Sequence, residues 1–329
     1  GPIDRREFLR VGTLALGGLG LSDLLAARAA AQVSSDTTVI LFWMWGGPSQ
    51  LETYDCKPDA PSEYRGPLRP IKTTVPGMDI CEVFPLQAKL GHRISLVRSL
   101  CHQMSSHNDG SIEVLTGKTP AKEDVTSTAK SDHPDFGMIA SRVRGPRHDG
   151  MPQYVGVQRA PFMTNPGYLG VSHQAFETGD PAKPDFSPKN LTLATGIDNQ
   201  RLDDRKRLLT QFDGFRRVLD RDHEAIDQFR ATAFSILTGS RVANAFDLSK
   251  EDSKLRDRYG RHRWGQSCLL ARRLAEAGVA VINVDATAPN DTTKHFSWDD
   301  HAGAFHLDYA QRERLPQMDQ ALAALITDL

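Results

Sequence analysis

The stretch SWDDHAGAFH, residues 297–306, places two carboxylates and an imidazole in a row: Asp299, Asp300 and His301. Carboxylate oxygens together with imidazole nitrogens suit zinc, manganese or iron, whereas calcium and magnesium prefer oxygen ligands alone. A metal held in this way lowers the pKa of bound water or neutralises a phosphoryl or sulfuryl oxygen. A plainer interpretation also fits, in which Asp300 caps the helix that follows and His301 is solvated. Both interpretations stay open.

Two further loops carry residues of the same chemical types. Their polar residues include Ser49, Glu52 and Asp55 in GGPSQLETYD, and His107 and Asp109 in CHQMSSHNDGS. Each loop by itself can also be a turn or a helix cap, because Gly, Pro, Ser and Asp favour both. The loops indicate a site only if the fold brings them together.

Three apolar, β-branched runs are expected to position these loops. Residues 37–45 and 279–284 are largely hydrophobic without strict alternation, and residues 92–100 are interpreted in the same way around Ile94, Leu96 and Val97; these runs indicate strands buried on both faces of a parallel sheet. Each run precedes one of the polar loops. Ligands of open parallel sheets bind beyond the carboxyl ends of the strands, so the sequence predicts one shared site.

The second half of the chain predicts helices that cover such a sheet. Residues 253–276 read as one amphipathic helix, with Gly278 as its C-cap before the third strand. Another helix is predicted near the end, with these residues on one side: Leu315, Met318, Leu322, Leu325 and Leu329. The pattern predicts an α/β fold with a mostly parallel sheet and helices on both faces. A strand is expected directly after Leu329, so the domain is expected to be truncated at its C-terminus.

The middle of the chain has a less regular pattern than the segments before and after it. Residues 120–200 are rich in Pro, Gly, Asp and Asn, and predict long loops or an irregular insertion with short strand candidates at QYVGVQ and LTLAT. FPLQAKLG, residues 84–91, predicts a short helix, and helical spacing also covers residues 201–237.

Residues 1–31 predict a twin-arginine export signal. Arg5 and Arg6 precede a weakly apolar stretch, and residues 29–31 offer small side chains to a signal peptidase. The apolar stretch is too short and interrupted to span a bilayer. We therefore expect recognition by the twin-arginine export machinery, a periplasmic or otherwise exported location, no other transmembrane segment, and one domain over residues 37–329.

The composition excludes one class of partner. The chain of 329 residues is 39% hydrophobic and 25% charged, and its formal net charge is −1. It lacks the basic field that a nucleic-acid partner requires. Its four cysteines form no C-x-x-C pair, which excludes a zinc ribbon or thioredoxin-type motif. In an exported protein, one disulfide of undetermined pairing and buried free thiols remain alternatives.

Long segments of the chain carry a family resemblance. They are RREFLR, WGGPSQLETYDCKPDAP, RGPLRPIKTTVPGMDICEVFP, SHNDGSIEVLTGKTP, RYGRHRWGQSCLLARRLAEAGVAVINVD, SWDDHAGAFH and LPQMDQALAALITDL. With them the chain resembles the exported family called domain of unknown function 1501, a distant relative of the alkaline phosphatase and sulfatase superfamily. The resemblance spans most of the chain except the irregular middle, and it implies an alkaline-phosphatase-like α/β sandwich.

The resemblance also implies metal ligands. In that superfamily an Asp/His pair after a central strand binds one metal, and the sequence WDDH looks like this family's version of the pair. Asp299 and His301 would then be ligands, with His107 and Asp109 as further metal or anion contacts. The metal would be zinc, manganese or iron rather than calcium.

The nucleophile does not match the superfamily pattern. Residues 115–117, Leu-Thr-Gly, are similar to a sulfatase tail, but counting back from them puts the nucleophile position near His107. Ser105 and Ser106 are the neighbouring candidates. The aspartate that follows the first strand in the superfamily is also absent, and Glu52 or Asp55 could substitute for it.

These expectations combine into a predicted function. The chain is expected to be an exported, metal-dependent hydrolase-like protein that acts on phosphate or sulfate esters of small molecules or glycans. Ser49, Glu52 and Asp55 are expected to contact the substrate. The alternative is a non-catalytic exported binding or assembly protein, or an inactive fragment of such an enzyme, because a later Gly-Glu-Phe-Gly-Arg-like loop and Asp-His pair of the family are not in the sequence.

Overall fold

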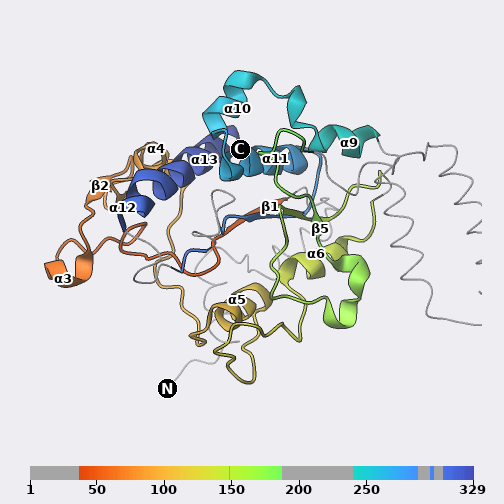
Figure 1. The fold of residues 1–329 in the computed structure, drawn as a ribbon, viewed down its shortest axis with the longest axis horizontal. Coiled ribbons are helices and arrows are strands. Elements are labelled where there is room, and N and C mark those ends of the chain that lie inside the picture. Colours follow the sequence, from red (N-terminus) through yellow and green to blue (C-terminus); the bar gives the residue numbers. More distant parts are fainter. Residues whose placement is uncertain (1–36, 148, 187–239, 288–296, 300–306) are drawn as a thin grey trace, which may run out of the picture. The chain divides into compact units, whose positions relative to one another are not determined.

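A four-stranded parallel sheet forms the centre of the fold (Figure 1). The computed structural model describes residues 37–147, 149–186, 240–287, 297–299 and 307–329. The chain divides into two units, Gly1–Thr37 and Thr38–Leu329, and every described element belongs to the second. In spatial order the strands are β1 (Val39–Trp43), β6 (Val281–Asp285), β4 (Tyr154–Val157) and β5 (Phe176–Glu177). Trp43 is in register with Asp285, so the carboxyl ends of β1 and β6 meet at one edge.

Helices cover both faces of the sheet. On one face lie α11 (Arg263–Glu276) and α13 (Leu315–Asp328), and on the other α5 (His107–Thr116) and α6 (Phe136–Arg144) (Figure 1). Successive strand residues point to opposite faces. Ile282 and Val284 accordingly join the cluster under α11 and α13, whereas Val281 packs with α6 and Leu41 with α5. The predicted α/β class, with its parallel sheet and covering helices, is confirmed at this level.

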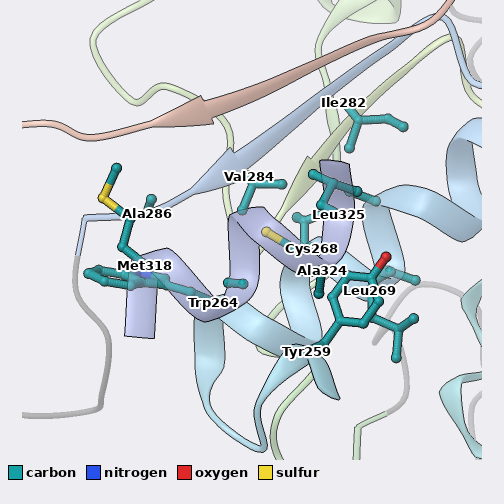
Figure 2. Close-up of a cluster of buried hydrophobic side chains, with 14 of the residues drawn as sticks. Tyr259, Trp264, Cys268, Leu269, Ile282, Val284, Ala286, Met318, Ala324 and Leu325 are labelled. Carbon is teal, nitrogen blue, oxygen red and sulfur yellow. The ribbon is translucent and has the colours of Figure 1, made fainter. Parts of the chain in front are cut away.

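The largest apolar cluster lies under α11 and α13 (Figure 2). Trp264 and Leu269 of α11 are completely buried there, beside Ile282 of β6 and Met318 and Leu325 of α13. Burying a side chain of this size stabilises the fold by roughly 1.5–3 kcal/mol. The apolar face predicted for the last helix is therefore its packing face, apart from Leu329, which is 70% exposed.

The single helix predicted over residues 253–276 is two helices. α10 (Ser253–Tyr259) ends at Gly260, whose φ of +94° is costly for other residues. α11 then starts afresh, because the His262 ring nitrogen Nδ1 caps it by accepting a hydrogen bond from Gly265 N at 3.2 Å. The prediction of one helix is wrong here because helical spacing continues across a glycine that breaks the backbone.

The buried strand predicted over residues 92–100 is also wrong. The chain makes one 3₁₀ turn, η1 (Gly91–Arg93), and then continues without a strand, with Val97 73% and Leu100 75% exposed. Both sides of β6 are taken by other segments, β1 and β4. A short hydrophobic run fits a strand and an apolar loop equally well, so its pattern alone could not decide.

The remaining elements are short. They are α3 (Ser62–Arg65), the antiparallel pair β2 (Pro70–Lys72) and β3 (Asp79–Cys81), α4 (Pro85–Ala88), η2 (Gly167–Leu169), η3 (Val171–His173), α9 (Ser240–Phe246), η5 (Leu248–Lys250), α12 (Leu307–Tyr309) and the π-helical turn η6 (Ala310–Arg314). The predicted short helix 84–91 corresponds to α4, and QYVGVQ to β4. The segment 120–200 thus supplies α6 and two strands of the central sheet within its described part.

Several predictions fall on parts of the chain that the structure does not describe. They are the export signal over residues 1–31, the strand candidate LTLAT, the helix over residues 201–237, and the ligand His301. Within the described ranges, no helix combines the length and the apolar character needed to cross a membrane.

Candidate active site at the carboxyl edge of the sheet

An imidazole and a carboxylate from distant parts of the chain meet beyond the carboxyl ends of β1 and β6. His107 Nε2 lies 2.8 Å from Asp299 Oδ2, and the two side chains are 32% and 29% exposed. The pair is therefore reachable from solvent but partly shielded, which strengthens its electrostatic interactions relative to bulk water. Two of the predicted metal ligands are brought together in this way.

The residue before Asp299 is fixed by the sheet and the core. Trp298 donates from its backbone N to Trp45 O at 2.9 Å, and from its indole to Ala286 O at 2.7 Å, so it bridges the chain ends beyond β1 and β6. The buried Arg314 of η6 lies over the Trp298 ring at 4.3 Å. Asp299 thus extends from a residue that is held on three sides.

Gly46 allows the turn after β1 to approach this segment closely. Its φ is +106°, and a Cβ at this position would lie 2.5 Å from Asp299 N and 2.8 Å from Trp298 N. Both distances are too short for any real side chain, and the backbone atoms concerned have no rotamer that would relieve them. The close packing against Trp298 and Asp299 therefore explains why glycine occupies position 46 in the WGG motif after the first strand.

His107 is the first residue of α5, and the cap of that helix sets its position. Ser106 Oγ accepts a hydrogen bond from Asp109 N at 3.3 Å and donates one to Asp109 Oδ2 at 2.9 Å. The Trp45 ring packs edge-on against the His107 ring at 5.4 Å, and Trp45 Nε1 donates to Asn108 Oδ1 at 3.3 Å. Trp45 therefore contacts both segments that carry the His107–Asp299 pair: the start of α5 through His107 and Asn108, and the segment before Asp299 through Trp298.

A further charged group lies at the end of β4. Arg159, 46% exposed, donates to the carboxylate of Asp285, the last residue of β6. Its guanidinium lies over the Phe162 ring at 5.2 Å, and Phe162 meets Trp45 edge-on at 5.3 Å. Contacts thus run from Arg159 through the two aromatic rings to His107. One edge of the sheet carries a cation, a carboxylate and an imidazole–carboxylate pair.

The backbone after β4 is strained where it delivers Arg159. Gln158 has φ +72°, which is uncommon for a residue other than glycine. Its side chain donates to Asp285 O at 2.9 Å and to Ser267 Oγ at 3.1 Å, which holds the strained conformation. The chain then folds back over Gly156, where a Cβ would lie 2.6 Å from Ala160 N. Strain of this kind gathers at functional sites.

The two predicted nucleophiles already make hydrogen bonds. Ser106 caps α5, and Ser105 Oγ donates to Glu123 Oε1 at 2.5 Å. Hydrogen bonds from the Ser105 hydroxyl and from the backbone N–H groups of both serines lower the pKa of the Glu123 carboxyl below its usual value. A carboxylate with a lowered pKa is a weak general base, so Glu123 is poorly suited to activate Ser105.

Asp109 belongs to the cap of α5. It is completely buried, and its Oδ2 accepts hydrogen bonds from Ser106 Oγ and from Asp124 N. Its Oδ1 has no hydrogen-bond partner among the residues that the structure describes. Its contacts stabilise the turn that presents His107, and within the described part of the chain none of them reaches Asp299.

The predicted substrate contacts lie in the turn after β1. Ser49 Oγ accepts from Leu51 N at 3.3 Å, as in a turn. Asp55 pairs with Lys57 at 2.6 Å and with Arg98 at 3.5 Å. The Glu52 carboxylate packs against Gly66, where a Cβ would lie 2.5 Å from Oε1. Through these contacts the three residues bind other parts of the protein: Leu51 for Ser49, Lys57 and Arg98 for Asp55, and Gly66 for Glu52.

The pair supplies two of the donors that a metal centre needs. Its imidazole and carboxylate groups are ligands that fit zinc, manganese or iron. In the described ranges, no cluster of three or more His, Cys, Asp or Glu residues could hold a metal ion. His301, the other predicted ligand from WDDH, lies outside these ranges, so its role stays a prediction.

Sequence reasoning missed three residues of this edge. Arg159 directly follows the strand candidate QYVGVQ, and a polar residue after a buried strand was the signal applied to the other loops. Asn108 stands between His107 and Asp109 in SHND, but its type gave no reason to single it out. Trp45 looked like the end of an apolar strand, because a contact with His107 is not visible in local sequence.

The parallel sheet, its two helical layers and its polar carboxyl edge define an α/β protein with ligand-type residues beyond its strands. The family profile described as protein of unknown function (DUF1501) matches residues 36–329, and the chain belongs to this family. The predicted family is thereby confirmed. Searches among curated proteins and among solved structures give no match.

Proposed function

We propose that this chain is an exported, metal-dependent hydrolase-like protein of the alkaline phosphatase and sulfatase type, acting on phosphate or sulfate esters. The observation that carries the proposal is the His107–Asp299 pair, 2.8 Å apart and one-third exposed. It lies beyond the carboxyl ends of parallel strands, where such sheets bind their ligands.

In this proposal His107 and Asp299 hold one divalent metal, and His301 is a third ligand. Two donors that each lie about 2.1 Å from a metal are about 3.0 to 3.4 Å apart in octahedral or tetrahedral geometry. The 2.8 Å between His107 Nε2 and Asp299 Oδ2 is close to that separation, so a small outward movement suffices. When bound, such a metal polarises an ester oxygen and lowers the pKa of a coordinated water.

Arg159 would recognise the anionic part of the substrate. A guanidinium presents several N–H donors in one plane, which match the oxygens of a phosphate or sulfate group. Asp285 accepts from Nε of Arg159 and holds the side chain in place, while 46% of that side chain stays exposed. Arg159 therefore orients the ester, and the His107–Asp299 pair holds the group that attacks or polarises it.

A non-catalytic binding or assembly protein is the second candidate. It is favoured by the finding that no three potential ligands gather in the described part of the chain, and by the hydrogen bonds of Ser105 and Ser106. Such a protein would keep the fold and the Arg159 anion contact without turnover.

Metal content separates the two candidates. Elemental analysis of protein purified without chelators is expected to find about one equivalent of zinc, manganese or iron. His107→Ala, Asp299→Asn and His301→Ala should each lose it, while His133→Ala, an exposed histidine that packs on Tyr168, should retain it. Metal-free natural protein would contradict the hydrolase proposal and favour the binding protein.

Activity then tests the role of Arg159. With p-nitrophenyl phosphate and p-nitrophenyl sulfate as probes, His107→Ala should reduce kcat/KM by about 100-fold or more. Arg159→Ala should reduce kcat/KM with unchanged metal content, because Arg159 contacts the ester and not the metal. No hydrolysis of either ester by metal-loaded natural protein would contradict the catalytic part of the proposal.

A further inference from the structure

Two of the four cysteines, Cys56 and Cys81, are free thiols on neighbouring segments of the fold. The side chains of Cys56 and Cys81 lie close enough to influence each other's pKa, although Cys56 follows the turn after β1 and Cys81 ends β3. Cys81 is completely buried, and Cys56 is partly buried against the same apolar cluster. The sequence alone left the pairing of cysteines open.

The backbone holds these two segments together next to the thiols. Cys81 N donates to Thr53 O at 2.9 Å. Arg98 joins the segments a second time, by donating from Nε to Tyr54 O at 2.9 Å and from Nη2 to Asp79 O at 2.7 Å. Each hydrogen bond lies within three residues of a cysteine, so the approach of the thiols follows from the packing of both segments.

We propose that Cys56 and Cys81 form an intramolecular disulfide when the folded chain meets a disulfide oxidant. The Cys56 thiolate attacks one sulfur of the oxidant, which releases one thiol and leaves a mixed disulfide on Cys56. Cys81 gives up its proton and attacks the Cys56 sulfur, which releases the second thiol. The protein loses two hydrogen atoms, and the oxidant disulfide is reduced to two thiols.

The burial of the two sulfurs makes this a structural rather than a reactive disulfide. Desolvation raises the pKa of Cys56, and it raises the pKa of Cys81 to about 12. A thiol with a raised pKa is a poor attacking group, so neither cysteine resembles the low-pKa thiols of redox enzymes. The bond would join the turn after β1 to the β2–β3 hairpin.

The other two cysteines serve as internal controls. Cys101 is exposed, and Cys268 is completely buried in the cluster under α11. Oxidation of Cys101 shows how an accessible lone thiol reacts with the oxidant. Oxidation of Cys268 shows how a buried lone thiol reacts with it.

The test is a disulfide map of the folded protein after incubation with glutathione disulfide. Mass spectrometry of a non-reduced digest should find one linked peptide pair, containing Cys56 and Cys81. Two of the four thiols should disappear from a denatured thiol titration, in addition to any Cys101 thiol that forms a mixed disulfide with glutathione, which the mass of its peptide reveals. Reduction should lower Tm by about 5 to 10 °C, as expected for a closed loop of this length.

Two serine variants test whether the linked pair and the Tm shift depend on Cys56 and not on Cys101. Cys101→Ser should leave the linked pair and the Tm shift unchanged, and Cys56→Ser should abolish both while staying folded with a Tm near that of the reduced natural protein. Linked peptides that contain Cys101 or Cys268, or four free thiols after incubation, would overturn the proposal. Neither result depends on whether the protein hydrolyses an ester.

Discussion

The face of the sheet under α11 and α13 and the carboxyl edge of the same sheet are built in opposite ways. Under the helices, Trp264, Ile282 and Leu325 are at most 5% exposed and contact mainly other apolar side chains. At the edge, the partners His107 and Asp299 are each about one-third exposed. Charges are costly to bury without partners, so the polar groups stay at the rim while the apolar face carries the stability.

One residue belongs to both regions. Trp298 stacks on Trp264 at 5.3 Å inside the apolar cluster, and the residue after it is Asp299. The core therefore sets where the carboxylate stands. Changes in the core should cost mainly stability and changes at the rim mainly function, and the following predictions test this division.

The largest effect is expected from Trp264→Ala. Trp264 is completely buried, stacks on Trp298 and meets the edge of Phe42 at 5.9 Å. Removing so large a buried side chain should lower the free energy of unfolding by about 3–5 kcal/mol, measured by urea denaturation. Tyr64→Ala, at a position 73% exposed, should change it by less than about 0.5 kcal/mol. Equal effects of the two variants would break the comparison.

An intermediate effect is expected from His262, a polar group inside the apolar half. Burial lowers the pKa of His262 from 6.5 to about 4. The unfolded chain therefore binds this proton at higher pH than the folded chain does. Stability should fall as pH drops from about 6.5 to about 4, by at most about 3 kcal/mol from this group.

His262→Asn isolates that contribution. Asparagine can still cap α11 by accepting from Gly265 N, as His262 Nδ1 does at 3.2 Å, but it does not titrate. Urea denaturation from pH 7 to pH 4 should show a shallower loss of stability in the variant. Identical pH profiles would mean that other groups carry the acid sensitivity.

The sharpest effect on function, with a smaller effect on stability than that of Trp264→Ala, is expected from Gly46→Ala. Both Gly46 and Gly47 have positive φ, so alanine at either should cost about 1 kcal/mol from the backbone. Only at Gly46 would the new Cβ meet Asp299 N, at 2.5 Å, whereas at Gly47 it meets no atom within 4 Å. Gly46→Ala should cost about 1–2 kcal/mol more.

The metal readout completes this comparison. Gly46→Ala should lose the bound metal or ester hydrolysis, because it displaces the segment that carries Asp299, while Gly47→Ala should keep both. Loss of function in both variants would show that the turn after β1 acts as a whole and not through its contact with Asp299.

Much of the fold was predictable because local pattern and burial agree. The strands β1 and β6 and the helix α13 follow from apolar runs and spacing, and long sequence segments identified the family. The helix break at Gly260 and the missing strand over residues 92–100 were not predictable, because a glycine within a regular pattern and a short apolar run each fit more than one structure.

The sequence by itself determined the residue types of the candidate site and the edge at which they should gather. It named His107 and Asp299 from their residue types and from the family resemblance, although the strand predicted before His107 does not form. Only the tertiary structure decided that these two meet at 2.8 Å, and that Arg159 joins the same edge through Phe162 and Trp45. Local sequence fixes which way a chain leaves a strand, whereas contacts between segments far apart in the chain depend on how the whole core packs.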